Sequence, residues 1–227
     1  TVGRLMRRRV GPLRVIVPMK PLADAKSRLW TDVPTLQREG VILLMLDTVA
    51  RAALDALGPG ACTVIGGDLR GRAVAEEAGA VWQEDPGGGL NAALWRAMQV
   101  AYAEGCAATL FMPGDLPSVQ QEDVVQIAAA SEDYTHPVGV RAEPDGGTNA
   151  LLVPAACAFE PRLGEDSFAK HVAAAANVGT TLRLLDLPRV AFDMDSFSDM
   201  VWARANVIGF DQRLYDWQSR LHDARRF

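Results

Sequence analysis

Three basic residues follow the first apolar run of the chain, in the stretch VIVPMKPLADAKSRL (15–29). They are Lys20, Lys26 and Arg28. The whole chain carries a net charge of −5, so a local cluster, and not the overall field, must attract any anion that the protein binds. Ammonium and guanidinium groups are the usual partners of phosphate. The stretch therefore predicts an anion-binding site, with solvated surface positions as the alternative for Lys20 and Arg28.

Aspartates follow two later apolar runs. Asp115 lies in the turn PGDLP, and Asp193 and Asp195 form the sequence DMD. Taken alone, Asp115 is consistent with a helix cap or turn former, and the DMD sequence is consistent with a solvated strand end. Together, the three carboxylates could converge on one hard cation, because Mg²⁺ accepts one or two carboxylates together with water and phosphate oxygens. Lysine and arginine beside such a metal are typical of a phosphoryl or nucleotidyl transfer site.

Glycines follow the second and third apolar runs. Gly66 and Gly67 end CTVIGG, and DPGGGLN places Gly89 and Asn91 at the start of a helical pattern. Backbone N–H groups at a helix start can cradle a nucleotide, and glycine lets a base approach the backbone closely. The alternatives are a tight turn and, for Asn91, a helix cap. Neither GxGxxG nor GK[ST] is present, so neither the dinucleotide fingerprint nor the P-loop is predicted.

Short apolar runs alternate with longer segments of helical period, which is the pattern of an α/β protein. Strands are expected at 13–19, 62–67, 80–84, 107–113, 136–141 and 148–154, with one or two edge strands within 181–195. Helices are expected at 34–57, 69–79, 118–130 and 167–179, and a glycine-rich turn leading into a helix at 85–105. This order predicts a mostly parallel sheet, covered on both faces, that binds ligands at the carboxyl ends of its strands.

Composition and charge narrow the class of protein. The chain is 49 % hydrophobic and 22 % charged, as is ordinary for a soluble globular protein. The acidic balance argues against nucleic-acid and anionic-membrane partners. Three scattered cysteines without CxxC pairing favour a reduced cytosolic protein, and neither a secretory signal nor a transmembrane segment is expected. We expect a cytoplasmic single domain over 1–227, with a core at about 13–204 and a C-terminal helical extension at about 205–227.

The C-terminal segment repeats apolar residues at helical spacing. They are Leu214, Trp217 and Leu221. This spacing favours a helix packed on the core. A dimer contact is the less favoured alternative, so monomer and homodimer both stay open. None of the three histidines has a spacing that suggests a metal pair or a catalytic triad.

Five motifs carry a resemblance to a known family. PMKPLADAKSRL, PGDLP, DGGTNALL, RLGEDSFAKH and DMDSFSDM occur in the order seen in the 2-phospho-L-lactate and phosphoenolpyruvate guanylyltransferase family. The resemblance implies a three-layer αβα sandwich with a mostly parallel mixed sheet, of the nucleotide-diphospho-sugar transferase (Rossmann-like) type. It also implies transfer of GMP from GTP to a phosphorylated three-carbon acid, with release of pyrophosphate, in deazaflavin coenzyme F-420 biosynthesis. The acid would be phosphoenolpyruvate, 2-phospho-L-lactate or 3-phospho-D-glycerate, and the sequence does not choose among them.

The resemblance implies roles for individual residues. The Mg²⁺ ligands would be Asp115, Asp193 and Asp195. The acid-binding residues would be Lys26, Thr148, Gly164 and Ser167, the last being alternatively the N-cap of its helix. Our own set for GTP, taken from the strand ends, is Pro18, Lys20, Arg28, Gly66, Gly67, Gly89 and Asn91, with catalytic roles for Lys20, Lys26 and Asp115. The family's Asp-Thr-Pro is Asp195-Ser196-Phe197 here and its Phe-Gly is Leu163-Gly164, which leaves open whether Asp193 or Asp195 binds the metal.

The expected nucleophile is the phosphate of the acid itself. Its second pKa is about 6, so it is mostly dianionic at neutral pH and requires no protein base. The obstacle is repulsion between two polyanions, at about 4 kcal/mol for one pair of unit charges roughly 4 Å apart. Basic residues and Mg²⁺ would offset it. The alternatives are a related enzyme with a molybdopterin or sugar phosphate acceptor, and a nucleotide-binding module without catalysis. A redox Rossmann protein is disfavoured because its fingerprint is missing.

Overall fold

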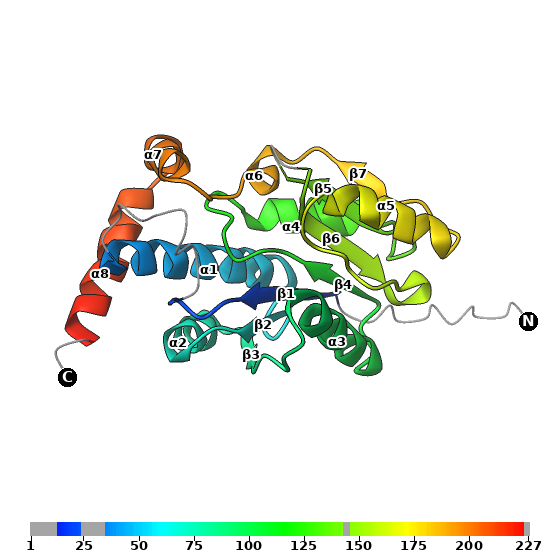
Figure 1. Cartoon of the computed structure of the whole chain (residues 1–227), viewed down its shortest axis with the longest axis horizontal. Helices are drawn as coiled ribbons and strands as arrows, with labels where there is room; N and C mark the ends of the chain where they lie inside the picture. The colour runs from blue at the N-terminus through cyan, green and yellow to red at the C-terminus, as the bar shows by residue number, and fades with distance from the viewer. Residues whose placement is uncertain (1–12, 24–34, 143–145, 225–227) are drawn as a thin grey trace, which may run out of the picture.

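The computed structural model describes residues 13–23, 35–142 and 146–224. A seven-stranded sheet in the order β3-β2-β1-β4-β6-β5-β7 forms its centre (Figure 1). The strands are β1 (Leu13–Met19), β2 (Cys62–Gly66), β3 (Val81–Gln83), β4 (Ala108–Phe111), β5 (Val138–Arg141), β6 (Thr148–Pro154) and β7 (Arg183–Leu185). The helices are α1 (Thr35–Leu57), α2 (Leu69–Ala78), α3 (Leu90–Ala103), α4 (Gln121–Ala130), the 3-10 turn η1 (Ala155–Cys157), α5 (Ser167–Asn177), α6 (Pro188–Ala191), α7 (Phe197–Asn206) and α8 (Phe210–Ala224).

Strand β6 runs against the other six strands. The pairs β1–β2, β1–β4, β2–β3 and β5–β7 are parallel, whereas β6 is antiparallel to both of its neighbours, β4 and β5. Phe111 of β4 lies opposite Leu151 of β6, so the first residues of β6 lie beside the loop that follows β4. The start of β6 therefore reaches the same edge of the sheet as the carboxyl ends of the parallel strands. The prediction of a mostly parallel mixed sheet is confirmed.

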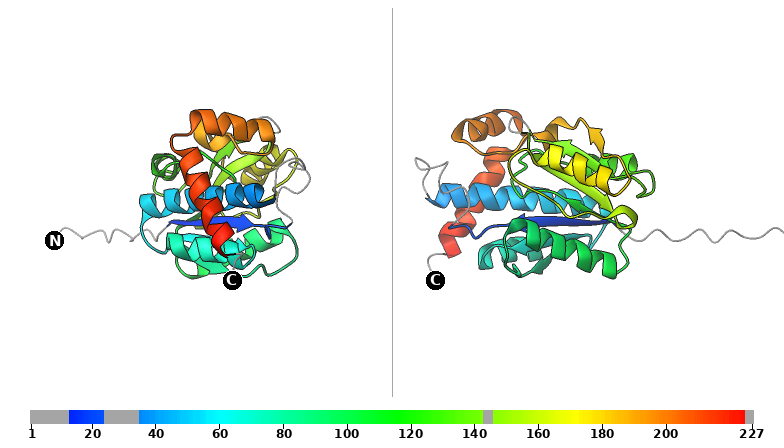
Figure 2. Two further views of the ribbon diagram at one scale, coloured as in Figure 1. Left: turned by 90° about the vertical axis from the view of Figure 1, so that its left-hand side faces the viewer. Right: turned by 45° about the vertical axis from the view of Figure 1, so that its right-hand side comes forward.

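Helices cover both faces of this sheet, and β1 shows why. Val15 and Val17 are buried on the face covered by α1, α2 and α4, whereas Ile16 is buried on the opposite face with residues of α3 and α5. Successive side chains of a strand point to opposite faces, so an all-apolar strand needs cover on both. Figures 1 and 2 show α1 and α3 on opposite sides of β1. The predicted αβα arrangement is confirmed.

The C-terminal helices pack on the side of α1 that faces away from the sheet. Met45 of α1 is buried in one cluster with Phe210 and Leu214 of α8, and Trp217 packs against it. Figure 2 shows α8 crossing α1. The packing helix predicted from the spacing of Leu214 and Trp217 is therefore present, whereas the side chain of Leu221 lies outside the described residues. Among the described helices, none combines the length and the apolar character needed to cross a membrane.

Segment 181–195 contains the strand β7, as predicted, but the part that follows β7 differs from the prediction. The residues that follow form the short helix α6, so the expectation that the DMD sequence follows a strand is wrong. Pro188 begins α6, because its fixed φ and missing N–H suit the first turn of a helix better than a sheet. Arg189 then donates from Nε and Nη2 to the two carboxylate oxygens of buried Asp123 of α4, at 2.9 and 2.8 Å. This ion pair anchors α6 and directs the chain toward Asp193.

Candidate active site

Three aspartates meet at the carboxyl edge of the sheet. Asp115 follows β4, and Asp193 and Asp195 follow α6. One carboxylate oxygen of each lies within 4.8 Å of the other two. The loop after β4 and the segment after α6 are directly joined, because the Met194 N–H donates to the Asp115 carbonyl oxygen at 3.1 Å. The structure thus brings together the three residues for which we predicted a metal site.

The buried residue between the two later aspartates anchors their segment. Met194 is fully buried among residues of α1, α7 and α8. Its neighbours Asp193 and Asp195 instead carry their carboxylates to Asp115. Asp195 is exposed, and Asp115 and Asp193 are half-buried. A hard cation could therefore reach all three carboxylates from solvent.

The surroundings of Asp193 disfavour the ionised form of its side chain. Burial, followed by the nearby charge of Asp115, raises the pKa of Asp193 to about 7. Asn149 of β6 opposes this shift, because its Nδ2 donates to Asp193 Oδ1 at 3.2 Å and also to the Ala191 carbonyl oxygen at 3.1 Å. Two crowded carboxylates favour the charged form when a cation binds between them. The donor set and its charge therefore suit a divalent metal ion.

Ser196, where the family has threonine, is the N-cap of α7. Its Oγ accepts from the Asp199 N–H at 3.2 Å, and the Asp199 carboxylate accepts from the Ser196 N–H at 2.7 Å, which completes a capping box. The same carboxylate accepts from the Asp195 N–H at 3.0 Å. The departure from Asp-Thr-Pro therefore leaves a capped helix start that fixes the backbone of Asp195.

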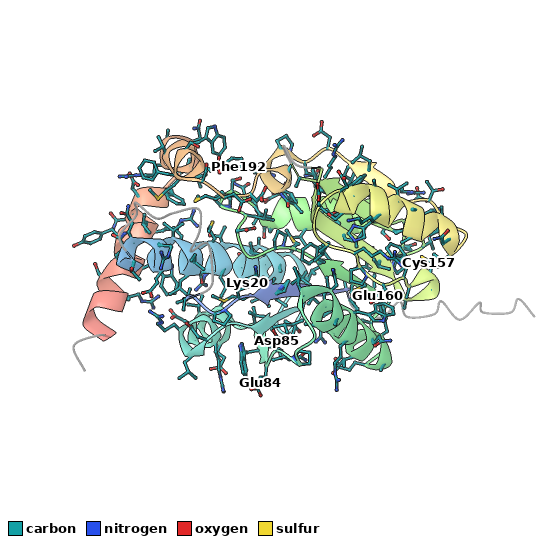
Figure 3. All side chains as sticks on the ribbon, in the orientation of Figure 1. Lys20, Glu84, Asp85, Cys157, Glu160 and Phe192 are labelled. Atoms are coloured by element: carbon teal, nitrogen blue, oxygen red, sulfur yellow. The ribbon has the colours of Figure 1, made fainter. Side chains whose placement is uncertain are left out.

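A cleft of about 530 Å³ opens beside the aspartates, a volume typical of small-molecule sites. Its lining includes Pro18, Gly89 and the charged residues Lys20, Asp85, Asp115 and Asp195. Its apolar wall includes Ile42 and Met45 of α1, Ile65 of β2, Leu90 of α3 and Phe111 of β4. Figure 3 labels Lys20, just beyond β1, and Asp85, on the connection from β3 to α3. A lysine and carboxylates in one cleft can hold phosphate groups and a cation together.

The two glycines that end β2 have a structural explanation. Both have φ near +80°, and a Cβ atom on Gly66 would lie 2.6 Å from the Met19 carbonyl oxygen. A Cβ atom on Gly67 would lie 3.0 Å from the Met19 sulfur. Met19 is therefore the residue that approaches both glycines closely. Neither Gly66 nor Gly67 lines the cleft. Their contact with GTP stays a prediction.

Asn91 also has protein partners. Its Nδ2 donates to the Leu163 carbonyl oxygen at 3.2 Å, and its Oδ1 accepts from the Leu163 N–H at 2.7 Å. This pair ties the start of α3 to the segment before α5. Gly164 follows at once, exposed and with φ +117°, and its carbonyl oxygen accepts from the Ser167 N–H at 3.0 Å. Asn91 thus holds the segment before α5 for which acid binding was predicted, and its own predicted contact with the nucleotide stays a prediction.

Thr148 and Ser167 form a second polar cluster with His171. Ser167 Oγ donates to Thr148 Oγ1, and Thr148 Oγ1 lies against His171 Nδ1, each at 3.0 Å. All three side chains are buried. Thr148 begins β6 next to Asn149, so this cluster neighbours the three aspartates. Sequence reasoning missed His171 and Asn149, although His171 lies four residues after Ser167 on the same helix face. Lys26 and Arg28 lie outside the described residues.

The arrangement of the sheet and its helices is the fold of known nucleotidyltransferases. Solved structures share the fold: a chain from Desulfovibrio desulfuricans assigned as a nucleotide-diphospho-sugar transferase has a TM-score of 0.73 at 18 % identity, covering 94 % of this chain and 96 % of that one. A nucleotidyl transferase from Methanothermobacter has a TM-score of 0.59 at 20 % identity, covering 86 % and 96 %.

Sequence comparison gives the family. Residues 13–215 match the family described as guanylyl transferase, CofC-like. A phosphoenolpyruvate guanylyltransferase of Roseiflexus castenholzii is 36 % identical over 190 residues, covering 84 % of this chain and 87 % of the relative. One of Rubrobacter xylanophilus is 36 % identical over 194 residues, covering 84 % and 93 %. The chain therefore belongs to the CofC-like guanylyl transferase family.

Proposed function

We propose that the protein transfers GMP from GTP to phosphoenolpyruvate, or to the related acids 2-phospho-L-lactate or 3-phospho-D-glycerate, in coenzyme F-420 biosynthesis. The observation that carries the proposal is the cleft that Lys20 lines together with Asp115 and Asp195, two aspartates that cluster with Asp193. Phosphoenolpyruvate comes first among the acids because two relatives, each 36 % identical, bear its name.

The three aspartates are the proposed Mg²⁺ site. Asp115 would hold the ion together with Asp193, Asp195 or both. Bound there, Mg²⁺ would supply positive charge that screens the triphosphate and polarises its α-phosphate. Asn149 would orient Asp193 through the hydrogen bond to Oδ1, as second partners of metal-binding carboxylates commonly do.

The reaction needs no protein base. A phosphate oxygen of the acid attacks the α-phosphorus of GTP, the bond from that phosphorus to the bridging oxygen breaks, and pyrophosphate leaves with the electron pair. Lys20 lies in the cleft and would offset charge on the triphosphate, as would Lys26 and Arg28. Thr148, Ser167 and Gly164 would hold the acid by hydroxyl and N–H donors.

Asp85 is a candidate for reading the guanine base. It lines the cleft, is exposed, and accepts from the Gly87 N–H through Oδ1 at 2.8 Å, which leaves Oδ2 for a ligand. Guanine offers two adjacent donors, at N1 and N2, that a carboxylate can accept, whereas adenine presents an acceptor at N1. A carboxylate at this wall would therefore favour GTP over ATP.

The experiment is pyrophosphate release from GTP and Mg²⁺, with the three acids offered in parallel and with ATP and CTP beside GTP. We expect release with GTP and phosphoenolpyruvate. Equal release with ATP or CTP would overturn the assignment of the nucleotide. Silence with all three acids, in protein that binds GTP, would overturn the assignment of the acceptor and favour a different phosphate acceptor or a non-catalytic module.

A pair of variants tests the metal site. Asp115→Asn should lower turnover at least a hundredfold, because it removes one of the charges that hold Mg²⁺, and it should leave the circular dichroism spectrum unchanged. Asp55→Asn, on the exposed end of α1, removes the same charge away from the cleft and should keep wild-type turnover. Unchanged activity of Asp115→Asn at limiting Mg²⁺ would contradict the metal role.

A further inference from the structure

The cluster of Thr148, Ser167 and His171 contains one more hydrogen bond that decides its chemistry. The backbone N–H of Arg162 donates to His171 Nε2 at 2.8 Å. An N–H can only donate, so Nε2 must carry a lone pair. Burial, with a smaller contribution from Lys170, lowers the pKa of His171 to about 4, so the ring is neutral at neutral pH. The single ring proton is therefore on Nδ1.

This tautomer determines what the two hydroxyl groups can do. With its proton on Nδ1, His171 donates to Thr148 Oγ1, which also accepts from Ser167 Oγ. The two hydroxyl groups hold two protons, and one of them is used between Ser167 and Thr148. The other remains available to a ligand. With the opposite tautomer, Thr148 would have to donate to Nδ1, and both protons would be used inside the cluster.

We propose that His171 is a positioning residue for the acid substrate, which keeps one hydroxyl proton of the Thr148–Ser167 pair free to donate to an oxygen of the acid. The inference rests on the proposed function, in which these hydroxyl groups bind the acid. Thr148 is the most exposed member of the cluster, at 6 % against 1 % for Ser167 and 0 % for His171. An anion accepts hydrogen bonds and donates none, so a pair without a spare proton would repel it.

Two amide substitutions separate the two ends of the ring. In His171→Asn the amide nitrogen takes the place of Nδ1 and can still donate to Thr148, but nothing accepts from the Arg162 N–H. In His171→Gln the amide oxygen takes the place of Nε2 and can still accept from Arg162, but nothing donates to Thr148, so its hydroxyl proton is no longer held toward the ligand. His171→Asn therefore keeps the hydrogen bond to Thr148 and loses the one from Arg162, whereas His171→Gln keeps the bond from Arg162 and loses the one to Thr148.

The test measures KM for phosphoenolpyruvate, KM for GTP and the thermal midpoint of both variants. We expect His171→Gln to raise the KM for phosphoenolpyruvate roughly three- to tenfold, the effect of one hydrogen bond, with an unchanged KM for GTP. His171→Asn should keep that KM near the wild-type value while its thermal midpoint falls further than that of His171→Gln. In a Thr148→Val background, His171→Gln should add no further rise.

The possible outcomes distinguish a failure of the proposed function from a failure of the inference about His171. If the wild type releases pyrophosphate with none of the acids, the proposed function fails, and this inference with it. If the wild type is active and Thr148→Val raises the KM for the acid, but His171→Gln does not, only the inference fails. The inference alone also fails if His171→Asn and His171→Gln raise the KM for the acid equally. A ¹⁵N-histidine spectrum, simple with three histidines, gives an independent readout, because a proton on Nε2 of His171 would overturn the tautomer.

Discussion

Replacing Asp193 by asparagine should stabilise the metal-free protein while weakening the proposed metal site. The pKa of Asp193 is raised from 3.8 to about 7 by burial and by Asp115. A shift of about three units corresponds to roughly 4 kcal/mol against folding when the group is ionised. Because the carboxylate is only partly buried, solvent screening lowers this to about 2 kcal/mol. The amide removes the charge, and its oxygen can still accept from Asn149.

The sign follows from the protons bound in each state. The folded state holds the Asp193 proton up to about pH 7, whereas the unfolded chain releases it near pH 3.8. The contribution of this group to stability therefore falls as the pH rises from about 4 to about 7 and stays constant above. The variant should match the wild type near pH 4 and exceed it by about 2 kcal/mol at pH 8 in EDTA.

Urea unfolding at pH 4, 6 and 8, with EDTA or with Mg²⁺, tests the prediction. Mg²⁺ at 100 times its Kd should stabilise the wild type by about 2.7 kcal/mol and the variant by less. Asp195→Asn is the control, because that exposed side chain should change metal-free stability by less than about 0.5 kcal/mol. An Asp193→Asn protein less stable than wild type in EDTA at pH 8, or an equal gain from Mg²⁺ in both, would refute the reasoning.

Three further predictions concern other parts of the molecule. Gly66→Ala should cost at least about 2 kcal/mol in urea unfolding, against about 1 kcal/mol for Gly60→Ala, which has a similar φ but no neighbour near its Cβ; equal costs would remove the steric argument. Asp85→Asn should reduce the preference of turnover for GTP over ATP at least tenfold, and an unchanged ratio would reassign the base contact. Asp123→Ala should cost about 2–3 kcal/mol, less than a fully buried pair because Arg189 is 41 % exposed, and a loss below about 1 kcal/mol in the same titration would contradict it.

The sheet and its ligand-binding edge were predictable because they follow from local patterns. Apolar runs such as 13–19 and helical segments such as 34–57 alternate, and parallel strands place their carboxyl ends together. That rule, with no knowledge of strand order, placed Lys20 and Asp115 at one edge, and both line the cleft. The helix at the C-terminus followed in the same way from its spacing.

The remaining features depend on partners that no local pattern contains. The lone pair on His171 Nε2 is set by a backbone N–H nine residues earlier, and Gly66 is required by the carbonyl oxygen of a neighbouring strand. Asp193 was expected after a strand, but Pro188 and the ion pair of Arg189 form a helix there. Each is a tertiary contact between segments that the sequence does not show to be adjacent.

The reversed direction of β6 explains how the proposed acid and metal subsites are held at a fixed distance from each other. Its first two residues point to opposite sides, as neighbours in a strand must. Thr148 meets His171, and Asn149 meets Asp193. A parallel strand in this place would bring its last residues to the cleft, and a shift of β6 by one residue would exchange the two side chains. One hydrogen-bonded strand start thus fixes both subsites relative to β4 and Asp115, so a change at either residue should be felt at both.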